Sequence, residues 1–76
     1  PVWTHNDQIF GLIRESARGK ILVLGNFSEW GQAVSRHRLY ELGFAGEMVE
    51  GINGRLLDAH SDIYLEPYQA MWLEKK

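Results

Sequence analysis

The chain has 76 residues, a formal net charge of −2 and no cysteine. This length allows a single domain, residues 1–76, and surface scaling predicts that folding buries about three-fifths of the surface of the open chain. The absence of cysteine excludes disulfides and thiolate metal sites, and no basic patch or long apolar run predicts a nucleic-acid or membrane partner. The first residue is Pro1, which we interpret as the start of a processed chain or an excised fragment, so the cellular compartment stays open.

Two apolar segments near the N-terminus predict the first strands. Residues 8–14 are expected to form one strand, in which Gly11 indicates a bulge or a close packing contact. Residues 20–27 form the clearest strand of the sequence. Both of its faces are apolar, with Ile21, Val23 and Phe27 on one and Leu22 and Leu24 on the other. Such a strand is either central in a sheet or covered by a second protein surface.

The later segments predict short strands at intervals of about 8–12 residues, which is typical of an antiparallel β-sandwich or barrel. Residues 34–39 are expected to form an edge strand with Arg36 and Arg38 on one face. Asn53 and Gly54 lie between two extended runs and indicate a hairpin, because both residues tolerate positive φ. The strands expected in the C-terminal half are residues 47–50, 55–58, 62–66 and 68–74, which brings the expected total to about seven.

No group of residues has the spacing of a catalytic or metal site. His5, His37 and His60 lack a second ligand at a suitable distance along the chain, and we interpret them as surface or capping residues. The carboxylates lie beside expected turns, where solvated charges are usual. Neither a phosphate-binding loop nor a nucleophile elbow occurs, so we expect no catalytic residue, no metal and no cofactor.

Aromatic residues are frequent, with three Trp, three Tyr and three Phe. Tyr64, Tyr68 and Trp72 fall within expected strands, which favours core packing together with contact to another domain. Trp3 and Trp30 lie outside the strand patterns and are the best candidates for contact with something beyond the domain, whether protein or sugar. The candidate contacts to a neighbouring domain or a sugar are Trp3, Leu22, Leu24, Trp30 and Tyr40.

Two segments carry a resemblance to a known family. Residues 22–28 (LVLGNFS) resemble the strand and "NFS" segment that opens the C-terminal domain of many α-amylase-family enzymes. Residues 63–73 (IYLEPYQAMWL) are similar to the closing pattern of that domain, an apolar strand followed by Pro-Tyr and a last strand. The resemblance runs from about Ile9 to Glu74, and within the family it is greatest to the amylosucrases, which also share residues 11–14 (GLIR).

The resemblance implies an all-β, antiparallel Greek-key β-sandwich that packs on a catalytic (β/α)-barrel. Amylosucrases transfer glucosyl units from sucrose to an α-glucan through a covalent glucosyl-enzyme, and both of the required carboxylates come from the barrel. None of the barrel's motifs occurs in this chain, so no catalytic residue carries over.

The expected function is therefore that of a non-catalytic C-terminal domain, a fragment of a larger enzyme, whose partner is the barrel of the same parent chain. A carbohydrate-binding module that contacts α-glucan through exposed aromatics is the alternative. Self-association of the isolated domain through an exposed apolar patch is a third interpretation.

Overall fold

The computed structural model of the chain describes residues 1–17, 19–44, 46–51, 54–58 and 61–75. They form seven strands and one helix. In chain order these are β1 (Ile9–Ser16), β2 (Gly19–Asn26), β3 (Gln32–Val34), α1 (Arg36–Glu41), β4 (Glu47–Glu50), β5 (Leu56–Asp58), β6 (Ile63–Leu65) and β7 (Ala70–Lys75). The predicted all-β fold of about seven short strands is confirmed.

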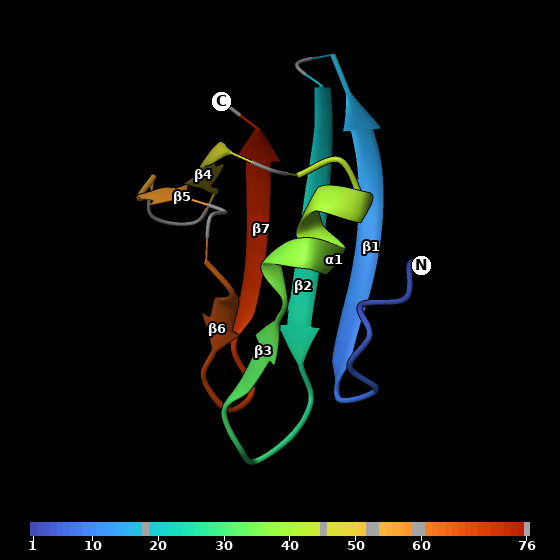
Figure 1. Cartoon of the computed structure of the whole chain (residues 1–76), viewed down its shortest axis with the longest axis vertical. Helices are drawn as coiled ribbons and strands as arrows, with labels where there is room; N and C mark the ends of the chain where they lie inside the picture. The colour runs from blue at the N-terminus through green and yellow to red at the C-terminus, as the bar shows by residue number, and fades with distance from the viewer. Residues whose placement is uncertain (18, 45, 52–53, 59–60, 76) are drawn as a thin grey trace.

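The strands form two sheets. The larger has five strands in the order β1-β2-β7-β4-β5, and the smaller pairs β3 with β6. Every strand pair in both sheets is antiparallel. Figure 1 shows α1 and the small sheet lying in front of the large one, so that they cover a single face of it. The Greek-key connectivity stays a prediction.

The first hairpin explains the glycine in β1. The pairing runs without interruption from Ile9 opposite Asn26 to Ser16 opposite Gly19, so β1 carries no bulge. A Cβ at Gly11 would instead lie 2.7 Å from Cγ2 of Thr4, which is closer than real Cβ atoms come to a neighbour. The close packing contact, one of the two predicted explanations for Gly11, is therefore the correct one.

The core lies between the large sheet and the elements that cover it. In antiparallel sheets alternate residues point to opposite faces. The apolar residues that point into the core are Leu22 and Leu24 in β2 and Met71 and Leu73 in β7. The buried apolar residues are Ile9, Leu22, Leu24, Val34, Leu39, Phe44, Met48, Ile63, Leu65, Met71 and Leu73. Because α1 and the small sheet contribute to this core, both are fixed on the same face of the large sheet.

The edge strand predicted for residues 34–39 is wrong, because the chain turns into α1 after β3. Ser35 caps the helix: its backbone is extended and its hydroxyl accepts a hydrogen bond from the backbone N–H of Arg38 at 3.1 Å. Gly43 follows the helix with a φ of +88°, a conformation that favours glycine at helix ends. The helix places Leu39 in the core, which a continued strand would not do.

The predicted strands of the C-terminal half are confirmed in outline as β4 to β7. β4 and β5 pair as a hairpin, in which the N–H of Gly54 donates to the carbonyl of Glu50 at 2.8 Å. Residues 52–53 of the predicted Asn-Gly turn lie outside the described residues. No helix in the described part of the chain is long and apolar enough to cross a membrane.

Candidate functional site

The side of the large sheet that faces away from α1 carries apolar residues on all five strands, and the charged residues Arg14 and Glu74 lie in the row of Ile21 and Val49. Cross-strand partners share a face, so the face of each residue follows from the pairing. One row joins Leu12, Val23 and Trp72, and a second joins Val49 to Leu56. We call this surface the outer face, and its apolar members are Phe10, Leu12, Ile21, Val23, Val49, Leu56, Ala70 and Trp72.

Large side chains of the outer face reach solvent. Phe10 is 43% exposed, Leu56 55% and Trp72 39%. Phe27, which follows β2, extends the surface, because its ring packs edge-on to that of Phe10 at 6.3 Å between centroids. An antiparallel sheet with one solvated face normally carries polar side chains there. A sheet face with this many exposed apolar side chains is therefore an unusual surface.

Trp72 is held firmly at the middle of the outer face. A Cβ built on Gly51 would overlap Nε1 of the indole, so the ring lies across this glycine. The N–H of Gly51 also donates to the carbonyl of Trp72 at 2.8 Å. A rigid, partly exposed indole loses little conformational entropy when a partner covers it, and such side chains dominate the energetics of many interfaces.

Polar residues of the "NFS" segment, residues 26–28, stabilise the fold through hydrogen bonds. Asn26 is 1% exposed, and its Nδ2 donates to the carbonyls of Trp30, Leu65 and Glu66 at 2.8, 3.2 and 3.1 Å. Its Oδ1 accepts from the backbone N–H and the hydroxyl of Ser28 at 2.9 and 2.8 Å. Asn26 thereby joins the end of β2, the loop that follows it and the end of β6.

Of the predicted contact residues, Leu22 and Leu24 lie in the chain's own core. Both are fully buried, so as folded they present no surface to a neighbouring domain or a sugar, which corrects their assignment as contacts. Trp3, Trp30 and Tyr40 are 56%, 69% and 70% exposed. Among the described residues no ring contact joins any two of these three aromatics, and Trp3 instead packs near His5.

The prediction that Tyr64, Tyr68 and Trp72 pack in the core is wrong, because all three side chains reach solvent. The residues that the sequence interpretation missed are the remaining members of the outer face, above all Phe10, Val49 and Leu56. The available signal was the second apolar face of residues 20–27, since Val23 on that face pairs with Leu12 and Trp72, which are apolar as well.

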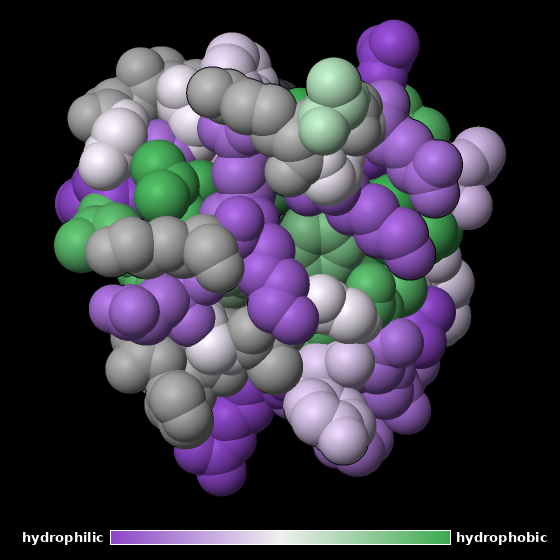
Figure 2. All heavy atoms as spheres, turned by 90° about the horizontal axis from the view of Figure 1, so that it is seen from above, coloured by the Kyte–Doolittle hydropathy of each residue, from purple (hydrophilic) through white to green (hydrophobic). Residues whose placement is uncertain are grey.

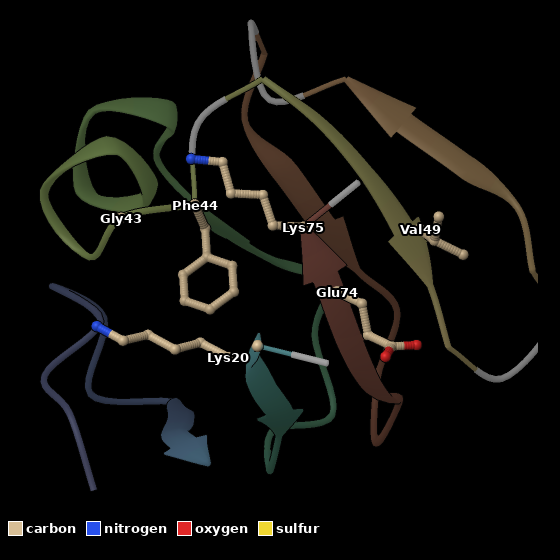
Figure 3. Close-up of a pocket in the computed structure, with 7 residues that line it drawn as sticks. Lys20, Gly43, Phe44, Val49, Glu74 and Lys75 are labelled. Carbon is tan, nitrogen blue, oxygen red and sulfur yellow. The ribbon is translucent and has the colours of Figure 1, made fainter. Parts of the chain in front are cut away.

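A hollow of about 600 Å³ lies at one end of the large sheet. It is lined by Gly19, Lys20, Gly43, Phe44, Val49, Glu74 and Lys75. Figure 3 shows the Phe44 ring between the Lys20 and Lys75 side chains, and Figure 2 looks onto this end, where apolar atoms are visible between polar residues. The lining offers two ammonium groups and one carboxylate around an apolar floor, and it contains neither a histidine nor a hydroxyl or thiol nucleophile.

A cluster of charge surrounds Glu41 at the end of α1. Its carboxylate lies 3.2 Å from Nη1 of Arg38, 3.3 Å from Nε2 of His37 and 4.0 Å from Nε2 of His5. The hydrogen bond from Arg38 is the main reason why the pKa of Glu41 is lowered, and both histidines add to the effect. His60 lies outside the described residues, and within the described ones no group of three His, Cys, Asp or Glu side chains is placed to hold a metal ion.

The lowered pKa of Glu41 predicts a small acid-dependent loss of stability. Its ionised form is favoured in the folded state, so the stabilisation is present above the ordinary pKa of 4.5 and is lost as the pH falls through the lowered folded-state value. We expect Glu41→Gln to lower the melting temperature slightly at pH 7 and by less at pH 3, which is below the ordinary pKa of 4.5. Glu29→Gln, at an exposed carboxylate without an ion pair in the described part of the chain, is the control. A deficit of the Glu41 variant that is unchanged at pH 3 contradicts the assignment.

No protein-family model matches this chain. The structure itself defines an antiparallel β domain in which α1 and the small sheet cover one face of the large sheet, whereas no described residue covers the largely apolar other face.

Proposed function

We propose that this chain is a non-catalytic accessory domain whose outer face packs on the catalytic (β/α)-barrel of an amylosucrase-like enzyme of the α-amylase family and stabilises that barrel. The observation that carries the proposal is the outer face itself, an apolar surface that extends over five strands and has no cover among the described residues. The resemblance in residues 22–28 and 63–73 supplies the identity of the partner.

The energetics favour a large protein surface as the occupant. Covering Phe10, Leu56 and Trp72 would contribute about 1–2 kcal/mol each, given their exposed area. Flat apolar surfaces of this kind suit a second packed layer better than a small solute, because a small solute leaves most of the sheet in water. Charged groups on the outer face gather toward one end, where Arg14 and Glu74 flank Ile21.

The two segments that carry the resemblance also contact each other. The backbone N–H of Asn26 donates to the carbonyl of Gln69 at 2.9 Å, and the Asn26 side chain donates to the carbonyls that end β6. The side-chain carbonyl of Gln69 in turn accepts from the N–H of Glu66 at 2.8 Å. These hydrogen bonds stabilise the fold where the two segments meet. They support the proposal of a non-catalytic domain, because the residues of the resemblance have structural roles.

The proposal is tested by comparing the chain alone with the full-length protein. Phe10→Ser and Leu56→Ser change exposed residues, so we expect little change in the melting temperature of the isolated chain. In the full-length enzyme the same changes are expected to lower the melting temperature by several degrees and to leave the KM for sucrose nearly unchanged, because the loss is one of interdomain packing. Tyr40→Ser, at a residue that is 70% exposed on α1, is the matched control.

Two results contradict the proposal. The first is an equal shift of the melting temperature in the isolated chain and the full-length protein. The second is a reading frame in which the segment before Pro1 encodes no barrel.

A further inference from the structure

The small sheet carries an exposed tyrosine that the core does not explain. In β6, Ile63 and Leu65 are buried, and Tyr64 between them points away from the core and is 60% exposed. Tyr64 pairs with Ala33 of β3, which is also exposed. Because the small sheet covers the inner side of the large one (Figure 1), this surface and the outer face meet only at Leu56, which borders a hollow next to Tyr64.

The ring of Tyr64 is held in place by a glycine. A Cβ built on Gly31 would overlap the Tyr64 hydroxyl and would lie 2.7 Å from Cε1, so this edge of the ring rests on Gly31. The φ of Gly31 lies outside the positive range, so its backbone does not require glycine, whereas the position of the ring does. A large exposed ring that is fixed in this way resembles a prepared stacking surface more than a loose surface residue.

Two hollows border the ring, one with a polar lining and one with a mixed lining. A hollow of about 330 Å³ is lined by Arg55, Tyr64, Glu66 and Gln69. A second hollow of about 380 Å³, which Tyr64 also borders, has the polar residues Arg55, Ser61 and Asp62 and the apolar residues Leu56, Leu57, Ile63 and Met71 in its lining. Gln69 is fixed there by the hydrogen bond that its Oε1 accepts from the N–H of Glu66.

We infer that this surface binds a neutral oligosaccharide, with one pyranose ring stacked on Tyr64. The C–H bonds of a pyranose face carry small positive partial charges, which the negative face of an aromatic ring attracts. Hydroxyl groups of the same sugar donate strongly to a carboxylate such as that of Glu66 and exchange hydrogen bonds with an amide such as that of Gln69. The two hollows together offer the carboxylates of Glu66 and Asp62 against the single guanidinium of Arg55, so their net negative charge disfavours an anionic ligand.

The experiment is an NMR titration of the isotopically labelled chain with maltoheptaose in one arm and cellohexaose in the other. We expect weak binding, with a dissociation constant of about 1 mM, to one or both sugars, and shifts confined to residues around Tyr64. Tyr64→Ala is expected to weaken binding about tenfold, and Tyr64→Phe to retain it because the stacking face remains. Gly31→Ala is expected to weaken binding by displacing the ring.

Tyr40→Ala is the matched control, since Tyr40 is 70% exposed against 60% for Tyr64 and lies on α1. Thermal unfolding of each variant shows whether it is folded. Binding by neither sugar at about 20 mM, or equal loss in the Tyr40 and Tyr64 variants, overturns the inference. The outer face contains neither Tyr64 nor Gly31, so either proposal can fail while the other stands.

Discussion

Replacing Asn26 by alanine is expected to lower the free energy of unfolding by about 3 kcal/mol. The side chain is buried and makes hydrogen bonds through both its oxygen and its nitrogen. Alanine leaves the carbonyl of Leu65 and the N–H of Ser28 buried without these partners, and each such group costs about 1–3 kcal/mol. A chain of 76 residues has a total stability of about 4–11 kcal/mol, so the loss is a large fraction of it.

Urea-induced unfolding followed by tryptophan fluorescence measures this change. Asn26→Asp retains the acceptor and loses the Nδ2 donor, so we expect it to fall between the alanine variant and the wild type at a pH where the new carboxylate is protonated. Asn6→Ala, at a half-buried amide that bonds Gln32 and Ala33 nearer the surface, is the control and is expected to lose less. A loss below about 1 kcal/mol for Asn26→Ala contradicts the role assigned to this residue.

Leu24 and Val23 are neighbours on opposite faces of β2, and they are expected to respond very differently. Leu24 is fully buried against the covering layer, so Leu24→Ala leaves a cavity and is expected to lower the free energy of unfolding by about 3–4 kcal/mol. Val23 is half-buried on the outer face, so Val23→Ala in the isolated chain is expected to cost about 1 kcal/mol or less.

The same two substitutions can be compared in the isolated chain and in the full-length protein. If a barrel covers the outer face, Val23→Ala lowers the free energy of unfolding more in the full-length protein than in the isolated chain. The loss caused by Leu24→Ala stays nearly constant. If the two substitutions lowered the free energy of unfolding of the isolated chain by the same amount, the faces assigned to Leu24 and Val23 in β2 would be wrong.

The strands were predictable because their signals are local. The alternation in residues 20–27, the turn residues between 50 and 55, and Pro67 after β6 each act over a few residues. The strand predicted for residues 34–39 failed because the alternation of Arg36 and Arg38 covers too few residues to exclude a helix, and in α1 these two residues lie about 200° apart around the helix axis. The signals that distinguish the two are the cap at Ser35 and the glycine at position 43, and these outweigh the weak strand pattern.

The candidate site was less predictable than the fold. The sequence shows that β2 has two apolar faces, but the choice of the covered face depends on where α1 and the small sheet lie, which is a matter of tertiary packing. Leu22 and Leu24 were therefore interpreted as contacts, and Phe10 and Leu56 were missed. Likewise, membership of a strand does not reveal whether Tyr64 or Trp72 faces the core.

The three tryptophans provide a direct measurement of docking through the outer face. Trp72 lies on this face, whereas Trp3 lies in the N-terminal segment and Trp30 in the loop between β2 and β3. Each has one indole N–H signal in a nitrogen-15 correlation spectrum of the labelled chain, which can be titrated with the proposed barrel produced as a separate polypeptide. We predict that the Trp72 signal shifts or broadens while those of Trp3 and Trp30 stay in place. An unmoved Trp72 signal, whether or not the other two respond, would contradict docking through this surface.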